Sequence, residues 1–137
     1  MKRILTSVVF VVLLFPALAL GEEVVDWDDL VNRDGIYYIK FTDVPFTGKT
    51  TGQGQGLIVN GQYEGPWFHY YDNGRLLEKG DYKNGEKEGT WVSYWVNGQL
   101  MEKTNFKNGE KEGAWVRYYD NGQLHWTGTY KNNVKVD

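Results

Sequence analysis

Histidine and serine side chains are the groups best suited to acid–base or nucleophilic chemistry, and this chain has few of them after residue 21. The two histidines are His69 and His125, and the one serine is Ser93. A nucleophile needs a base beside it, and the base needs a group that orients it. Because the two histidines fall at different positions of the repeat described below, no catalytic pair is predicted. We expect no catalytic residue and no enzyme activity.

Two further segments contain residue types that can bind phosphate or metal. Gly52-Gln53-Gly54-Gln55-Gly56 has some of the glycines of a phosphate loop, but no helix is predicted after it and half of the fingerprint is missing. Asp26, Asp28 and Asp29 form an acidic cluster without the alternating ligands and closing glutamate of a calcium loop. The chain has no cysteine, which excludes thiolate metal sites and disulfides. We therefore expect no cofactor and no bound metal.

The first 21 residues have the composition of a secretory signal peptide. Lys2 and Arg3 precede an apolar run over 8–15, and small residues spaced for cleavage follow Pro16. The whole apolar stretch is at the short limit for spanning a bilayer, so an uncleaved anchor is the competing interpretation. We expect cleavage near Gly21 and a secreted or periplasmic location.

The charge and composition of the remaining chain bear on its partners. Removal of the two basic residues leaves 13 basic and 18 acidic residues, a net charge of −5. This charge predicts no binding to nucleic acid, and it does not favour contact with an anionic membrane surface, although such contact stays open. The 137 residues suffice for one domain or one short repeat array. An aromatic content of 16% is too high for a disordered chain.

An internal repeat with a 24-residue step begins at residue 60. Asn-Gly pairs recur at this step in two series, and Trp67, Trp91 and Trp115 keep the same step. A fixed period of this size predicts units that must stack on one another to bury a core. The expected units are a leader with a degenerate copy over 22–59, copies over 60–83, 84–107 and 108–131, and a C-terminal cap over 132–137.

Each copy is predicted to form a β-hairpin. Asn-Gly between apolar runs favours a two-residue turn in which both residues have positive φ. We place this turn at Asn73-Gly74, between strands over 67–72 and 75–83, and interpret 84–89 as a looser link to the next copy. No helical periodicity is found in the repeats. The sequence therefore predicts an all-β protein, an elongated single-layer antiparallel sheet of tandem hairpins.

The two-residue turn also predicts a register and the faces of the sheet. It sets Trp67 opposite Gly80, an arrangement in which an indole can shield bare backbone, and it sets Tyr71 opposite Leu76. Lysines and glutamates recur between the aromatic positions and predict a solvated face of mixed charge. These residues are Lys83, Lys87, Lys107, Lys111 and Lys131 with Glu86, Glu88, Glu110 and Glu112.

The repeat resembles the MORN-variant repeat, a bacterial relative of the MORN (membrane occupation and recognition nexus) repeat. The residues that carry the resemblance read G-x-W-x-x-Y-aromatic-x-N-G-x-L, followed by an aromatic-Lys pair, and they cover 60–131. The resemblance implies β-hairpin repeats and little about activity. One branch of the family carries an antitoxin label, which implies an immunity-type protein as one alternative.

The aromatic side chains of the repeats are candidates for both stability and binding. These candidates are Trp67, Tyr70, Tyr71, Trp91, Tyr94, Trp95, Trp115, Tyr118, Tyr119 and Trp126. We expect a non-enzymatic module that binds an unidentified protein, serves as a scaffold or self-associates, because contiguous exposed rings mark interfaces. The alternative is a cell-wall glycan-binding protein that uses the rings as platforms. If the rings are purely structural, replacing a repeat tryptophan by alanine should cost roughly 3 kcal/mol or more.

Overall fold

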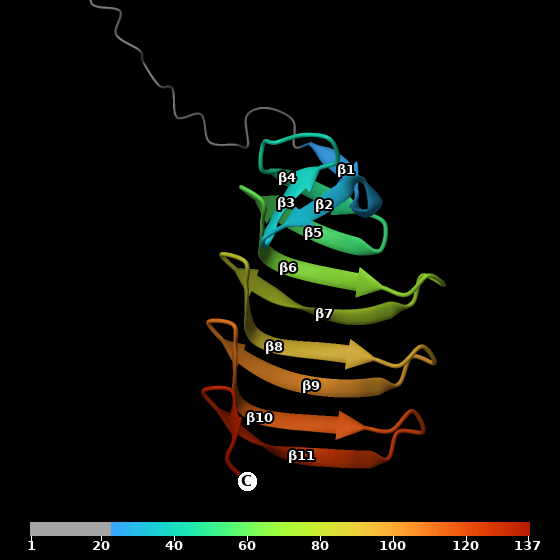
Figure 1. Ribbon diagram of the computed structural model, residues 1–137. Coiled ribbons are helices and arrows are strands. Elements are labelled where there is room, and N and C mark those ends of the chain that lie inside the picture. Colours follow the sequence, from blue (N-terminus) through green and yellow to red (C-terminus); the bar gives the residue numbers. More distant parts are fainter. Residues whose placement is uncertain (1–22) are drawn as a thin grey trace, which may run out of the picture.

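A computed structural model of the chain describes residues 23–137 (Figure 1). The signal peptide expected over 1–21 lies outside the described residues. No helix within 23–137 is long and apolar enough to cross a membrane. The elements are β1 (Val24–Asp26), η1 (Trp27–Asp29), β2 (Leu30–Arg33), β3 (Ile36–Ile39), β4 (Gly48–Thr51), β5 (Gly54–Val59), β6 (Gln62–Tyr70), β7 (Leu76–Lys83), β8 (Glu86–Tyr94), β9 (Leu100–Lys107), β10 (Glu110–Tyr118), β11 (Leu124–Lys131) and β12 (Val134–Lys135).

One long sheet dominates the molecule. Its order is β1-β4-β5-β6-β7-β8-β9-β10-β11-β12, so that from β4 onward each strand pairs with the next in the chain. These consecutive pairs are antiparallel, and only β1 runs parallel to its neighbour β4. Figure 1 shows the hairpins stacked in one direction as a single layer from β6 to β11. The predicted fold class is confirmed.

A second, small layer covers the N-terminal end of this sheet. β2 and β3 form a separate two-stranded sheet, and Figure 1 shows it in front of β4 and β5. Tyr37 of β3 packs on Trp27 and Tyr63, with ring centroids 5.2 and 4.9 Å apart. The buried core therefore lies toward this end of the array. Its buried members are Leu30, Phe46, Ile58, Trp67 and Trp91.

Two-residue turns were predicted at the series of Asn-Gly pairs that includes Asn73-Gly74. The structure has them at the other series, which includes Asn84-Gly85. Asn84 has φ 50° and Gly85 has φ 80°, and the flanking residues Lys83 and Glu86 pair directly. Asn60-Gly61 and Asn108-Gly109 repeat this geometry. Both central residues have positive φ, as in a type I′ turn, whose twist matches that of the strands. The looser link predicted over 84–89 is thus wrong, because it consists of a tight turn and the start of β8.

The predicted turn at Asn73-Gly74 instead contains three residues, 72–74. Gly74 has φ 81° whereas Asn73 keeps a negative φ, and the backbone N–H of Tyr71 donates to Arg75 O over 2.8 Å. The side-chain Oδ1 of Asn73 accepts a hydrogen bond from the N–H of Arg75. An asparagine that bonds to backbone two residues ahead stabilises this looped form without a positive φ of its own. The same bond recurs at Asn97 and Asn121.

The extra turn residue changes the register only near the turn. Trp67 lies opposite Gly80, Trp91 opposite Thr104 and Trp115 opposite Gly128, as predicted. The pairing predicted for Tyr71 and Leu76 is wrong, because a bulge after His69 puts Tyr70 opposite Leu76. Equivalent bulges shift the second and third copies in the same way.

Glutamates at one position of the repeat stabilise the next type I′ turn. The Oε2 atom of Glu64 accepts a hydrogen bond from the backbone N–H of Asn84 over 2.9 Å. Glu88 and Glu112 accept from Asn108 and Asn132, each over 2.8 Å. Glu88 and Glu112 were predicted only as part of a solvated face of mixed charge, and the structure gives their carboxylates the further role of accepting hydrogen bonds from turn N–H groups.

Replacing Glu88 by alanine should lower the free energy of unfolding by about 1–2 kcal/mol, the usual worth of a hydrogen bond to a charged group. Urea unfolding followed by tryptophan fluorescence measures this change. Glu86→Ala is the matched control, because Glu86 lies two residues away and is exposed. Equal losses for the two variants would show that the bond to Asn108 contributes nothing.

Candidate interaction surfaces

Two of the ten candidate aromatic residues lie inside the core and are not available to a ligand. Trp67 is 0% exposed and Trp91 is 4% exposed. Each indole lies on a glycine of the preceding strand: a Cβ placed on Gly56 would lie 2.5 Å from Trp67, and one on Gly80 would lie 2.3 Å from Trp91. The indole thus shields the glycine of the strand before it, whereas we predicted that it shields the paired glycine of its own hairpin.

A hydrogen bond fixes each of these two indoles. Trp67 Nε1 donates to Leu57 O over 3.0 Å, and Trp91 Nε1 donates to Asp81 O over 3.1 Å. The acceptor in both cases is the residue that follows the covered glycine. Ring, glycine and carbonyl therefore form one repeated contact that joins successive strands. We call this contact the indole step, and it occurs at Trp67 and at Trp91.

Trp115 departs from the indole step. The residue beneath it is Thr104, which replaces the glycine found at positions 56 and 80 and is itself buried. Among residues 23–137, Trp115 Nε1 is the one buried polar side-chain atom without a hydrogen-bond partner. Trp115 therefore has neither the glycine nor the hydrogen bond of the indole step, and it is only half-buried.

The aromatic residues near the three-residue turns join neighbouring hairpins. Tyr71 Oη donates to Tyr94 O over 2.8 Å, and Trp95 Nε1 donates to Tyr118 O over 3.2 Å. Tyr70 is also half-buried. Five further candidates therefore have a structural place at the hairpin ends, since each is half-buried in a contact between repeats. They are Tyr70, Tyr71, Tyr94, Trp95 and Tyr118.

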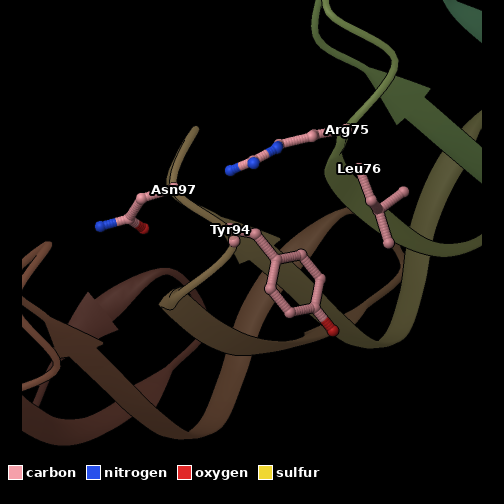
Figure 2. Close-up of a pocket in the computed structure, with 5 residues that line it drawn as sticks. Arg75, Leu76, Tyr94 and Asn97 are labelled. Atoms are coloured by element: carbon pink, nitrogen blue, oxygen red, sulfur yellow. The ribbon is translucent and has the colours of Figure 1, made fainter.

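An open hollow lies between the first two of these hairpin ends (Figure 2). It has a volume of about 370 Å³ and is lined by Arg75, Leu76, Tyr94, Asn97 and Gly98. Its polar side chains are engaged with backbone, since Arg75 Nη1 donates to Val96 O and Asn97 Nδ2 donates to Asp120 O. We therefore assign these side chains to the stacking of hairpin ends.

Lysines of the repeat lie over the rings on the tryptophan face. Lys87 Nζ is 3.9 Å from the centre of the Trp91 ring and 3.4 Å from a carboxylate oxygen of Glu78. Lys111 Nζ is 5.1 Å from the ring of Tyr130. These distances allow cation–π attraction. The predicted solvated stripe is thus wrong for Lys87 and Lys111, which cover the aromatic rings.

Exposed rings gather on the last hairpin. Trp126 is 53% exposed and Tyr119 is 45% exposed. Leu124, which is 57% exposed, lies opposite Tyr118 in the next register pair and so does not share the face of Trp126. Trp126 stands where the first two repeats have Glu78 and Glu102. Tyr119 stacks on His125, with ring centroids 4.0 Å apart. Of the ten candidates, Trp126 and Tyr119 are therefore the rings most accessible to a partner.

A family model for the MORN repeat variant matches residues 63–84, 87–108 and 111–132. The chain belongs to the MORN repeat variant family. None of the curated proteins compared with the chain matches it. The family identifies a repeat module, and in this module each MORN repeat contributes two strands and one three-residue turn to the sheet.

The MORN array keeps the two histidines apart, whereas Ser93 and His69 lie in one row on either side of Glu78, with the strand β7 between them. His69 packs beside Trp67, with ring centroids 5.6 Å apart, whereas His125 packs beside Tyr119 on another hairpin. Gly54 and Gly56 lie beneath the indoles of Trp27 and Trp67, and this contact explains the glycine-rich segment.

The acidic cluster also has a local role. Asp26 is the N-cap of η1, where its side chain accepts a hydrogen bond from the N–H of Asp28 over 2.9 Å. Across the described part of the chain, no three histidine, aspartate or glutamate side chains gather as a metal site. Short polar side chains at this position commonly satisfy the first N–H groups of a helix.

Burial alters the acid–base behaviour of three side chains in the MORN array. Desolvation lowers the pKa of His69 below its usual value of 6.5; the charge of Glu78 has a smaller effect that raises this pKa, and the charge of Lys87 lowers it further. Desolvation and the hydrogen bond with Tyr37 raise the pKa of Tyr63, and desolvation raises the pKa of Tyr82. These two tyrosines therefore remain protonated over the physiological range.

The lowered pKa of His69 predicts a loss of stability in mild acid. Below pH 6.5 the unfolded chain binds a proton at His69 more readily than the folded chain does, so the free energy of unfolding falls as the pH decreases. Urea midpoints measured from pH 7.5 to pH 5 should therefore decline. In His69→Ser, which copies Ser93 of the second repeat, the decline should be shallower. An unchanged slope would contradict a role for His69.

Proposed function

We propose that the chain is a non-enzymatic MORN module that binds another protein outside the cytoplasm. The observation that carries this proposal is the exposure of Trp126 and Tyr119, which lie on either side of His125 on one hairpin and are the most exposed of the ten candidate rings. Exposed apolar groups that lie together on a folded protein are typical of interaction sites. A scaffold role follows if the partner is itself part of a larger assembly.

The residues at this hairpin support binding rather than stability. The first two repeats have glutamate at the position equivalent to Trp126, so the fold does not require an indole there. Trp126 contacts His125 and lies near Lys135, and neither contact buries it. Tryptophan and tyrosine are enriched at the residues that dominate protein interfaces.

Cross-linking in the compartment where the chain resides tests the protein-binding function. Trp126→Glu restores the residue of the other repeats and should abolish the cross-linked partner. Val96→Glu is the matched control, because Val96 is equally exposed at 53% and lies on a different hairpin. Retention of the partner by both variants, or its loss in both, would contradict the proposed site.

The extracytoplasmic location rests on the sequence over 1–21 and has its own test. The cell fractions are separated, and the mass of the isolated protein is measured. A protein that lacks about 21 residues and is found in the periplasm or medium is the expected result. Recovery of the uncleaved chain from the cytoplasm would contradict the location.

Glycan binding is the second candidate and is favoured by the same exposed indole. A repeated platform is less favoured, because Trp67 and Trp91 are buried and cannot stack on a sugar. Light scattering of the full chain with solubilised cell-wall fragments separates the two functions. If the fragments increase the mass of the wild-type chain but not that of Trp126→Glu, the ligand of this site is a glycan and the protein-binding function is rejected. An immunity-type role is a special case of protein binding in which the partner is a secreted toxin.

A further inference from the structure

The outer edge of β11 lacks a neighbour that the equivalent strands possess. β7 pairs along its length with β6 and β8, and β9 pairs with β8 and β10. β11 pairs with β10 and, within the described residues, with β12 only at Tyr130 and Lys131. The backbone edge over 124–128 therefore has no second strand in the part of the chain that the structure describes.

The direction of the backbone groups along this edge follows from one hydrogen bond. The N–H of Val136 donates to Thr129 O, so the backbone groups of Thr129 point away from β10. These groups alternate along a regular strand, which places the N–H and C=O of Thr127 on the same outer side, whereas the bulge at His125 ends the alternation there. An added antiparallel strand would find a donor and an acceptor at Thr127.

A slot for an aromatic ring lies next to the same edge. Gly128 occupies the repeat position that holds Gly56, Gly80 and Thr104 in the earlier strands, and each of those two glycines carries the indole of the next strand. Trp126 and Tyr130 lie two residues to either side of Gly128 on the same face of β11. The corresponding residue of the first repeat, Tyr82, packs against Trp91 of the second repeat, with ring centroids 4.8 Å apart. Gly128 is thus a floor between two aromatic walls.

The C-terminal residues fill this slot in place of an indole. A Cβ placed on Gly128 would lie 2.9 Å from Lys135 Cε and 3.0 Å from Asp137 Oδ1. Lys135 Nζ lies 5.7 Å from the ring centres of both Trp115 and Trp126. The backbone N–H of Thr129 donates to Asp137 Oδ1. All residues over 132–137 are exposed, and they reach the slot with two flexible side chains.

We propose that this slot receives a tryptophan from an extended segment of a partner protein, and that the segment adds to β11 as an antiparallel strand. The incoming indole lies on Gly128 and donates from Nε1 to Thr129 O, as Trp91 lies on Gly80 and donates to Asp81 O. Residues 134–137 leave the edge of β11 when the segment binds, because β12 pairs with Tyr130 and Lys131 and the N–H of Val136 donates to Thr129 O. The inference rests on the proposed protein-binding function and specifies how the partner is recognised.

A peptide with the sequence of residues 86–94, Glu-Lys-Glu-Gly-Thr-Trp-Val-Ser-Tyr, is a direct probe, because this segment makes the indole step on β7. Its binding to the full chain is measured by fluorescence anisotropy of a label at the peptide N-terminus. Hydrogen exchange of the Thr127 amide, measured with and without peptide, locates the added strand. We expect binding, slower exchange at this amide, and no binding of the peptide in which alanine replaces tryptophan.

Variants of the chain test the slot itself. Gly128→Val fills the floor and should weaken the peptide at least about tenfold, whereas Thr129→Val changes the opposite face and should leave its affinity unchanged. Lys135→Ala with Asp137→Ala removes the competing side chains and should strengthen binding. Equal affinity for Gly128→Val and wild type, or no binding even to the double variant, would overturn the inference. A dimer of the full chain that Gly128→Val abolishes would also overturn it, by making a second copy the occupant.

Failure of the peptide experiment can be distinguished from failure of the proposed function. The cross-linking experiment depends on the exposed ring of Trp126 and requires no added strand. A partner that is lost in Trp126→Glu but retained in Gly128→Val would preserve the protein-binding function and reject the slot.

Discussion

Replacing Trp67 by alanine is expected to lower the free energy of unfolding by roughly 3–5 kcal/mol, which is enough to unfold much of the array. Trp67 is fully buried and donates a hydrogen bond to Leu57 O. It also contacts the rings of Trp27, Tyr63 and His69. Its removal leaves a cavity and an unpaired carbonyl beneath it. Urea unfolding at neutral pH, followed by circular dichroism, gives the loss directly.

The three repeat tryptophans should not be equivalent in this experiment. Trp115 is half-buried and its Nε1 has no hydrogen-bond partner, so Trp115→Ala should cost less than Trp67→Ala. Trp126→Ala is the surface control and should change stability by less than about 0.5 kcal/mol. Equal losses for Trp67 and Trp115 would contradict the assignment of the indole step to stability.

Replacing Gly80 by threonine is the second change with a large expected effect, about 2–4 kcal/mol of destabilisation from overpacking and a lost hydrogen bond. A Cβ on Gly80 would lie 2.3 Å from the Trp91 ring, which is rigid and held at Asp81 O. The Trp91 indole would have to move away from residue 80 and lose its hydrogen bond. Trp115, which lies opposite Thr104, also lacks this hydrogen bond. The urea midpoint should fall, and hydrogen exchange of the Trp91 indole N–H should become faster.

Gly128→Thr is the matched control for this substitution. The same side chain at Gly128 meets the flexible ends of Lys135 and Asp137 instead of a ring. Stability should change by less than about 1 kcal/mol, because exposed side chains can move aside. A loss as large as that of Gly80→Thr would show that glycine is required in this position for its backbone and not for the indole.

The hairpin array could be predicted because short segments of the chain determine its period and its strand pairing. The 24-residue step and the Asn-Gly pairs define the strands, and Trp67 opposite Gly80 follows from the alternation along two strands. The position of the tight turns could not be predicted in the same way. Asn-Gly forms a two-residue turn at 84–85 but part of a three-residue turn at 73–74, where the asparagine side chain bonds to backbone instead.

For the candidate site, the sequence predicted which aromatic residues to consider but not which of them are exposed. The sequence identifies ten aromatic residues, and side-chain burial divides them: Trp67 and Trp91 belong to the core, whereas Trp126 and Tyr119 are exposed. One clue was present in the sequence, since Trp126 replaces the glutamate of the first two repeats. A ring at a position that elsewhere holds a charge indicates a solvent-facing side chain.

The all-β array of hairpins can be recognised in the chain without coordinates, because turn chemistry and two-residue alternation act within a few residues of each other. The glycine that each indole covers, and the rings that remain exposed, become known only from the folded molecule. An indole reaches across to the preceding strand, so its place depends on a residue in another repeat, Gly56 for Trp67 and Thr104 for Trp115. Exposure at the last hairpin arises because no further hairpin stacks on β11 within the described residues.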